Sequence, residues 1–287
     1  MTAPVPPGAY GDSDWNEIWK ARQERYDASR IAGDTSHDWD RKENAERYAA
    51  QSAGEFEKRI RMTLDDLTVD PSTRVLDIGA GPGTLAVPLA PKVKEITAVE
   101  PGAGMIAALK ERTEREGIRN ITCVRKTWED VDPARDLNGP YDLVIASLSL
   151  TMHDIREAVQ KMDAISCGEV CLYWFVDLPF WERMYADLML PLHGTPYYSG
   201  PKADCLWNVL YQAAIYADVR MLPLDKEYRF SSRGEMAAFF KKRFCVTTPA
   251  QEEVLETYLS GLIHKEGKDV VVAGTSTFAK IRWKKKT

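Results

Sequence analysis

The chain has 287 residues, of which 44% are hydrophobic and 28% are charged, and its formal net charge is −5. This composition is typical of a soluble globular protein, and the length allows one large α/β domain with insertions or a domain with a cap. The negative net charge argues against broad nucleic-acid binding, which needs a basic surface.

Cysteine usage and the apolar stretches narrow the class of protein further. The five cysteines are Cys123, Cys167, Cys171, Cys205 and Cys245. An odd, scattered set in a chain of this size favours reduced thiols over a disulfide framework, and no spacing predicts a metal site. No stretch reaches transmembrane length and the first residues lack a signal-peptide pattern, so we expect a cytoplasmic protein with no membrane partner.

Two helices are predicted before the first strand. Residues 1–13 are rich in Pro, Gly and Ala and are expected to be extended or disordered. Trp15, Ile18 and Trp19 then recur at helical spacing and give the first helix an apolar stripe. A longer helix is predicted over residues 44–67. The side chains on its apolar face are Tyr48, Phe56, Ile60, Leu64 and Leu67.

Residues 75–85 read Val-Leu-Asp-Ile-Gly-Ala-Gly-Pro-Gly-Thr-Leu. The apolar run predicts a short buried strand, and the glycines after it predict a turn that leads into a helix. Glycine allows positive φ and has no Cβ, so this backbone can lie against a bound molecule, and the helix would direct free N–H groups toward it. A dinucleotide fingerprint would need its third glycine at Thr84, so the spacing is not that of the usual NAD motif.

Three further strands follow in alternation with helices, which predicts a parallel sheet. The second strand, residues 95–100, ends in Glu100, about 20 residues after the glycine turn, where a carboxylate can accept both hydroxyls of a ribose. A helix over residues 102–115 comes next. The third and fourth strands span residues 121–124 and 141–147.

The spacing Asp77-x-Gly79-x-Gly81-x-Gly83, with these strands in this order, resembles the first four motifs of the class I S-adenosylmethionine-dependent methyltransferases. The resemblance implies a Rossmann-like α/β fold. Its seven-stranded sheet would be mostly parallel with an antiparallel last strand and helices on both faces. It also implies S-adenosylmethionine as cofactor and S-adenosylhomocysteine as product.

The same resemblance assigns candidate site residues. Met105 would cover the adenine ring, and the loop after the third strand would contact the adenine amino group. Thr127 stands where the family often has an acid, so Glu129 or backbone groups must make that contact. The candidate cofactor-binding residues are Asp77, Gly79, Ala80, Gly81, Gly83, Glu100, Pro101, Met105, Thr127, Trp128, Glu129, Ser147 and Tyr48.

Residues 1–68 are predicted to form an N-terminal helical segment beside a methyltransferase domain over residues 69–287. Helices in this position often close the cofactor site in the family, so this segment either forms a lid or packs on the domain. Tyr48 would contact the methionine end of the cofactor if the segment is a lid.

The fifth strand, residues 169–176, ends at Asp177. Ligands bind beyond the carboxyl ends of parallel strands, so we expect Ser147, Ser149 and Asp177 near a substrate pocket. Residues 178–203 form an aromatic-rich insertion, which is either a packing element or a wall of that pocket.

The remaining predicted elements are a helix over residues 203–217, a strand over 219–230, a two-helix insertion over 232–264 and a final strand over 270–283. Ser232 and Thr248 begin sequences that resemble capping boxes. Gly274 lies within the last strand and predicts a bend or bulge.

We therefore expect methyl transfer to a small-molecule acceptor, with oligomeric state left open. The fourth motif, residues 146–149, reads Ala-Ser-Leu-Ser and lacks the Asn/Asp-Pro-Pro pattern typical of DNA-base amine methylation. His153, just past the fourth strand, is the candidate general base if the acceptor is protonated at neutral pH. The alternatives are an RNA or protein acceptor, a non-catalytic cofactor-binding protein, and another enzyme on this fold such as an aminopropyltransferase.

Overall fold

The computed structural model of the chain describes residues 13–30, 38–54 and 57–285. The predictions for residues 1–12 and 31–37, and for Phe56, lie outside the described residues.

Within the described residues, one sheet of eight strands organises the fold, in the order β3-β2-β1-β4-β5-β8-β6, with β7 paired to β8. The strands are β1 Arg74–Ile78, β2 Glu95–Val99, β3 Ile121–Val124, β4 Tyr141–Ser147, β5 Ser166–Phe175, β6 Asp218–Phe230, β7 Ile263–Glu266 and β8 Asp269–Lys284. The first five strands pair in parallel, and β8 runs antiparallel to β5, β6 and β7. This is the expected Rossmann-like sheet with one additional strand, β7.

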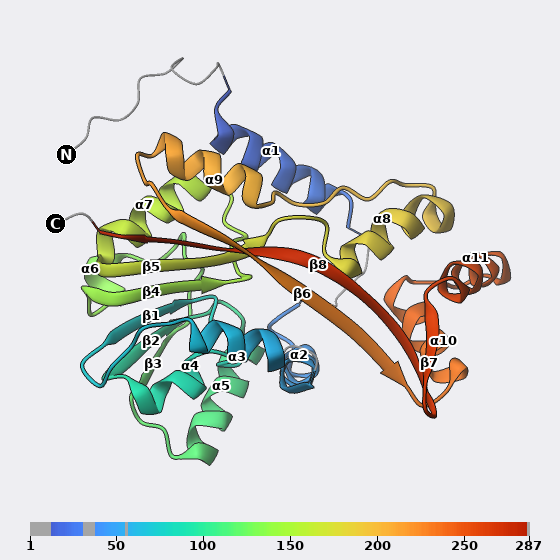
Figure 1. The fold of residues 1–287 in the computed structure, drawn as a ribbon, viewed down its shortest axis with the longest axis horizontal. Coiled ribbons are helices and arrows are strands. Elements are labelled where there is room, and N and C mark those ends of the chain that lie inside the picture. Colours follow the sequence, from blue (N-terminus) through green and yellow to red (C-terminus); the bar gives the residue numbers. More distant parts are fainter. Residues whose placement is uncertain (1–12, 31–37, 55–56, 286–287) are drawn as a thin grey trace.

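Helices cover both faces of the sheet. They are α1 Trp15–Ala28, α2 Lys42–Gly54, α3 Glu57–Asp65, α4 Ala86–Leu89, α5 Ala103–Glu116, α6 Pro133–Asp136, α7 Ile155–Ile165, α8 Phe180–His193, α9 Ala203–Gln212, α10 Arg233–Arg243 and α11 Pro249–Ser260. Figure 1 shows α1, α7 and α9 on one face and α2 to α5 on the other. The N-terminal segment is therefore divided between the two faces.

The helix predicted after the glycine turn is short. Only residues 86–89 are α-helical, and a 3₁₀ turn over residues 90–92 follows. Pro88 and Pro91 lack backbone N–H groups, so neither can donate in a helical ladder. The predicted helix is therefore much shorter than expected, and a four-residue helix has little dipole to direct at a ligand.

The face that α3 buries also differs from the prediction. Arg59 and Thr63 are its buried side chains, whereas Ile60 and Leu64 are only partly buried. Ile60 and Leu64 still pack against the main apolar cluster, and Leu67 is buried in it, so the predicted apolar face contacts the core while Arg59 and Thr63 are buried beside it.

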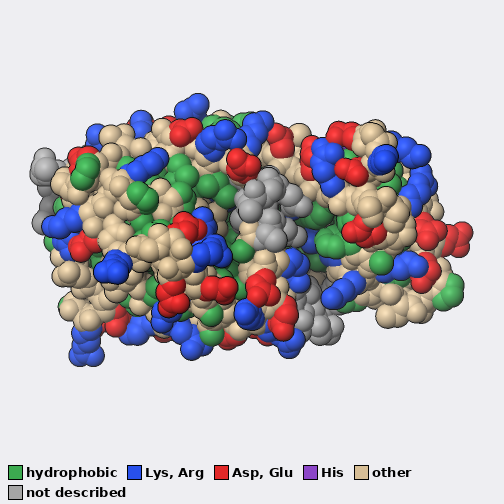
Figure 2. Space-filling model, turned by 90° about the horizontal axis from the view of Figure 1, so that it is seen from below, with side chains coloured by type: hydrophobic (Ala, Val, Ile, Leu, Met, Phe, Trp, Pro, Cys, Tyr) green, Lys and Arg blue, Asp and Glu red, His purple; other side chains and the backbone are tan. Residues whose placement is uncertain are grey.

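The outer ends of β6 and β8, together with β7, α8, α10 and α11, form an extension that we call the arm (Figure 1). Figure 2 shows acidic and basic side chains interspersed over both the main body and the arm on the face seen from below. An apolar cluster fills the arm, and the aromatic-rich insertion contributes Phe180, Tyr185 and Met189 to it. The described part of the insertion is thus largely a packing element.

Two local predictions in the arm have opposite outcomes. Thr248 and Gln251 form the expected capping box at the start of α11. Of the predicted bend or bulge at Gly274, the bulge is excluded, because β6 and β8 stay in one register from Asp218–Arg282 to Phe230–Val270. A Cβ at Gly274 would lie 2.1 Å from the Phe180 ring, so glycine makes room for that ring.

Candidate functional site

A cavity of about 380 Å³ lies at the carboxyl ends of β1, β2 and β4. Its volume is within the range of small-molecule and cofactor sites. All the predicted cofactor-binding residues except Gly83 line it. Gly83 instead packs beside Leu109 and Val87, so it serves the contact between helices and sheet.

The glycine turn forms the floor of the cavity. Gly79 has a φ of 70°, and a Cβ there would lie 2.3 Å from the Ser149 Cβ, because the loop after β4 crosses close to it. Gly81 has a φ of 57°, and a Cβ there would meet no atom of the described residues within 4 Å. Gly81 therefore faces open space in which a ligand can lie against the backbone.

Each carboxylate oxygen of Glu100, which follows β2, accepts a hydrogen bond from a backbone N–H group. Its Oε2 accepts a hydrogen bond from the Gly81 N–H at 2.9 Å, and its Oε1 accepts one from the Gly102 N–H at 2.8 Å. Burial raises the pKa of Glu100, although these two N–H groups oppose the rise. Each oxygen keeps a further lone pair, so the carboxylate can accept two hydroxyl groups from a ribose.

Asp77, at the end of β1, is only 2% exposed. Its Oδ2 has no hydrogen-bond partner among the described residues. Burial, with a smaller contribution from Glu100, raises the pKa of Asp77 to about 7. A buried acceptor without a partner is costly, and a cationic donor such as an ammonium group would satisfy it. The site therefore fits the amino-acid end of S-adenosylmethionine.

Trp39 forms a wall of the cavity that the sequence interpretation did not identify. Its carbonyl accepts a hydrogen bond from the Gly104 N–H at 3.1 Å, and Asp40 Oδ1 accepts one from the Ala103 N–H at 2.7 Å. This loop therefore caps the start of α5. The Trp39 ring meets the Tyr48 ring edge to face at 5.7 Å. In the sequence, Trp39 is an isolated aromatic residue between two aspartates in a polar loop, and this pattern could have marked it as a candidate site residue.

The three predicted cofactor-binding residues of the loop after β3 make different contacts. The Thr127 hydroxyl donates to Asp130 at 2.7 Å, and the Trp128 indole N–H donates to the Ala158 carbonyl at 3.1 Å within the core. Glu129 is exposed, and its Oε1 accepts a hydrogen bond from the His153 N–H at 3.3 Å. Glu129 is thus the carboxylate of this loop that borders the cavity.

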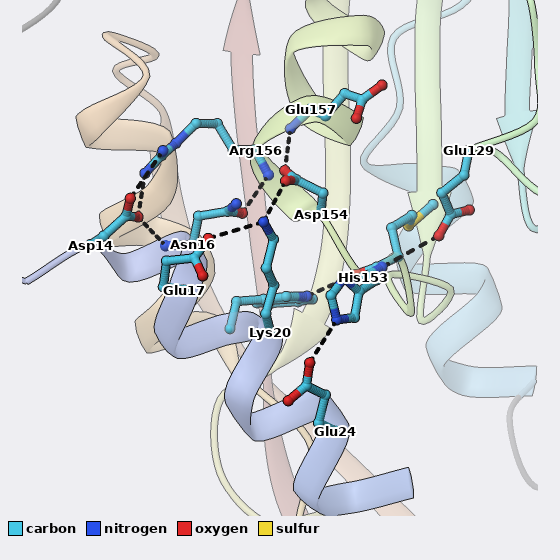
Figure 3. Close-up of polar contacts among 12 residues, drawn as sticks. Asp14, Asn16, Glu17, Lys20, Glu24, Glu129, His153, Asp154, Arg156 and Glu157 are labelled. Atoms are coloured by element: carbon cyan, nitrogen blue, oxygen red, sulfur yellow. Dashed lines mark hydrogen bonds and ion pairs between the residues drawn. The ribbon is translucent and has the colours of Figure 1, made fainter.

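His153 contacts α1 and is not a lining residue of the cavity (Figure 3). Its Nε2 lies 3.2 Å from Glu24 Oε1. Nearby, Lys20 pairs with Asp154 at 2.8 Å, and the fully buried Trp19 donates its indole N–H to the Met152 carbonyl at 2.8 Å. These contacts dock α1 on the loop after β4, so the structure does not bring the predicted base into the cavity.

Asp177 also lies apart from the cavity lining, unlike Ser147 and Ser149, which line it. Asp177 Oδ1 accepts a hydrogen bond from the Thr277 N–H at 2.9 Å, which joins the end of β5 to β8. Arg59 is a lining residue that the sequence interpretation missed. It is 6% exposed, and its Nη1 donates to Ser147 Oγ at 3.0 Å. Burial lowers the pKa of Arg59.

The described part of the chain contains neither a candidate metal site nor a candidate membrane-spanning helix. No group of three or more His, Cys, Asp or Glu residues in it could hold a metal ion. None of its helices is both long and apolar enough to cross a bilayer.

Comparison with known proteins agrees with this geometry. Residues 75–166 match the family described as "Methyltransferase domain". An uncharacterized protein of Haemophilus influenzae is 28% identical over 191 residues, which are 65% of this chain and 66% of that protein. The 23S rRNA (uracil(1939)-C(5))-methyltransferase RlmD of Stenotrophomonas maltophilia is 42% identical over 64 residues, 22% of this chain and 14% of that protein. The chain thus spans about two thirds of the first relative and far less of the second.

A solved structure shares the fold. It is phosphoethanolamine N-methyltransferase 2 of Haemonchus contortus, in complex with phosphomonomethylethanolamine and S-adenosylhomocysteine. The two chains are 13% identical, with a TM-score of 0.55 over 88% of this chain and 59% of that chain. At this identity the similarity concerns the fold alone.

Proposed function

We propose that this chain, which carries the domain of the class I S-adenosylmethionine-dependent methyltransferases, transfers a methyl group from that cofactor to a small-molecule acceptor. The observation that carries the proposal is one cavity in which Asp77, Glu100 and the glycine turn meet at the carboxyl ends of parallel strands. Ligands of open α/β sheets bind at this edge.

Each part of the cofactor has a matching group in the cavity. Glu100 would accept the ribose hydroxyls, and Asp77 would accept the ammonium group of the amino-acid end. Met105 and Trp39 would enclose the adenine ring, and Glu129 would accept a hydrogen bond from its amino group. Gly81 leaves room for the chain between ribose and sulfur.

Bound in this way, S-adenosylmethionine supplies a sulfonium methyl group, which bonds to a lone pair of the acceptor while the sulfur keeps the electrons of the broken bond. The protein contributes alignment and exclusion of water. The carboxylates of Asp77 and Glu100 would also favour a bound sulfonium cation electrostatically.

Two observations favour a small acceptor over RNA. The face seen from below mixes acidic with basic side chains, and its described part has no continuous basic surface (Figure 2). The rRNA methyltransferase relative shares only 64 residues with this chain. An RNA or protein acceptor and a non-catalytic role are therefore outcomes that the experiment must separate.

The first test is calorimetric titration of the purified protein with S-adenosylmethionine, S-adenosylhomocysteine and NAD. We expect micromolar binding of the first two and no binding of NAD. The protein is then incubated with methyl-labelled S-adenosylmethionine and either a metabolite extract, total RNA or a protein extract. Label in the metabolite fraction supports the proposal, whereas label only in RNA or protein contradicts it. Cofactor binding without transfer in any sample would indicate a non-catalytic protein.

A further inference from the structure

Lys161 of α7 holds the loop after β3 by its backbone. The ammonium group donates to three carbonyls of that loop, those of Trp128 at 2.7 Å, Glu129 at 3.1 Å and Val131 at 3.2 Å. A lysine ammonium has three N–H donors, so these bonds use all of them. The charge of this partly buried side chain is therefore directed at the main chain of the loop.

The path of the loop depends on this cation. Three carbonyl oxygens that point at one position repel one another, and a positive charge among them replaces the repulsion with attraction. Residues 128–130 form a turn, and the carbonyls of residues 128, 129 and 131 converge on the Lys161 Nζ. The turn therefore closes around the ammonium group.

Neighbouring contacts join the same loop to α7. Ala158 lies one helical turn before Lys161, and its carbonyl accepts the Trp128 indole N–H at 3.1 Å. The Lys161 ammonium also lies 5.1 Å from the centre of the Trp128 ring. Ahead of α7, the His153 N–H donates to Glu129 Oε1 at 3.3 Å (Figure 3). Both the main chain of the loop and the carboxylate of Glu129 are thus held from this side.

The contacts of Lys161 fix the direction of the Glu129 side chain in particular. A peptide unit is planar, so a hydrogen bond to its carbonyl orients the whole unit. The carbonyls of Trp128 and Glu129 belong to the two peptide units that flank the Cα of Glu129. Lys161 binds both carbonyls and therefore sets the backbone from which the Glu129 side chain projects.

Glu129 keeps one carboxylate oxygen for a ligand. It lines the cavity, whereas Lys161 is not among the described lining residues. Since Oε1 accepts the His153 N–H, Oε2 can accept a hydrogen bond from an amino group in the cavity. The three carbonyl contacts of Lys161 thus act at a distance on the carboxylate that borders the site.

We propose that Lys161 is a positioning residue for recognition of the base. It directs the Glu129 carboxylate at the amino group of adenine, so the site selects adenine over a base that lacks this group. This inference rests on the proposed function, in which Glu129 accepts that amino group. Lys161 acts through Glu129 and does not itself contact the cofactor.

The test compares S-adenosylhomocysteine with S-inosylhomocysteine, in which an oxygen replaces the amino group of the base. Calorimetry gives the Kd of each, and their ratio is the preference for adenine. We expect a preference of at least tenfold in the wild-type protein, because the carboxylate would otherwise face a carbonyl oxygen. In Lys161→Met, which keeps the apolar stem, the preference should fall below threefold. A purely structural role would lower the melting temperature and leave this ratio unchanged.

Lys285→Met is the matched control. Lys285 also donates to main-chain carbonyls of α7, those of Asp163 at 2.9 Å and Ala164 at 3.0 Å. These residues are in the last turn of the helix, next to the start of β5, whereas the cavity lies at the carboxyl ends of the strands. The control removes the same kind of contact from the same helix, and should retain the wild-type preference.

A double-mutant cycle tests whether Lys161 acts through Glu129. Glu129→Ala alone should abolish the preference, and adding Lys161→Met should reduce it no further. A preference that survives in Glu129→Ala, or losses that add in the double variant, would overturn the proposal.

The remaining outcomes separate this inference from the proposed function. Wild-type protein that binds both compounds equally, or a folded Lys161→Met with the full preference, would overturn the role of Lys161 and leave the cofactor assignment intact. Wild-type protein that does not bind S-adenosylhomocysteine would contradict the proposed function itself. If Lys161→Met does not fold, Lys161→Arg decides. Arginine keeps the charge, but its planar fork cannot direct its donors as the ammonium does, so a full preference in that variant contradicts the proposal and a reduced one supports it.

Discussion

The cavity region and the arm use buried polar groups in different ways. In the cavity region, the lining residues Asp77 and Thr84 each have a buried oxygen with no hydrogen-bond partner among the described residues. In the arm, interlocked aromatic rings dominate, and the buried cation Lys226 lies 4.6 Å from the centre of the Tyr228 ring. The cavity region thus accepts a cost in stability that a ligand can relieve. In the arm, burial and the nearby Arg243 lower the pKa of Lys226 to about 7, and the aromatic packing around this residue must offset that cost.

The largest expected effect concerns the stability of the arm. Phe240 is fully buried and contacts the rings of Tyr228, Phe230 and Phe244. Phe240→Ala should lower the free energy of unfolding by about 3–5 kcal/mol, because it leaves a cavity in a packed cluster. Urea denaturation measures this loss. The affinity of the folded fraction for S-adenosylhomocysteine should stay unchanged, and a parallel loss of affinity would show that the two regions are not separable.

Glu100→Ala should have the opposite effect: it should weaken cofactor binding while the fold is retained. We expect the affinity for S-adenosylhomocysteine to fall at least tenfold, about 1.4 kcal/mol, because the variant loses the acceptor for the ribose hydroxyls. Calorimetry gives the affinity, and circular dichroism checks that the fold is retained. Unchanged affinity in a folded variant would remove Glu100 from the site.

Asp77 should make cofactor binding depend on pH. Its pKa in the free protein is about 7, and only the carboxylate accepts the ammonium group. Affinity should therefore fall about tenfold between pH 8 and pH 6, as protonation competes with binding. In Asp77→Asn the affinity should be weak at both pH values. A wild-type profile that is flat over this range would contradict the role of Asp77.

Ionisation of Asp77, which favours cofactor binding, should have the opposite effect on the stability of the free protein. The folded carboxyl holds its proton to higher pH than the unfolded one, so this group lowers stability at pH 8. The penalty begins to shrink as the pH falls below about 7 and is gone only below the ordinary pKa of 3.8. Asp77→Asn should accordingly stabilise the free protein at pH 8, by about 1 kcal/mol. Thermal unfolding of both proteins at pH 8 measures this difference. A destabilised variant would show that Asp77 is not a cost to the free protein.

The smallest effect concerns a local contact in the arm. Thr248→Ala removes the side chain that accepts the Gln251 N–H, and should cost about 1 kcal/mol. Thr248→Ser, which keeps the hydroxyl, is the control and should restore most of the stability. Cofactor affinity should not change in either variant. A larger loss than that of Phe240→Ala would show that the cap, rather than the aromatic cluster, holds the arm together.

Local sequence determined the elements whose signals lie within a few residues. The bounds of β3 and β4, the turn from Asp77 to Gly83, the distance to Glu100 and the capping box at Thr248 are all of this kind. They could be predicted because hydrophobic periodicity, glycine and capping chemistry act over one turn of helix or one strand.

Only the tertiary structure decided which surfaces meet. Periodicity indicated Ile60 and Leu64 on the packed face of α3, and both contact the core, yet Arg59 and Thr63 are the more deeply buried side chains of this helix. Arg59 is held there by Ser147, a residue of β4 that is 88 positions away. Trp39 joined the cavity through backbone contacts with α5, a helix more than 60 residues later. A side chain's burial depends on partners far away in sequence, and no local pattern reports them.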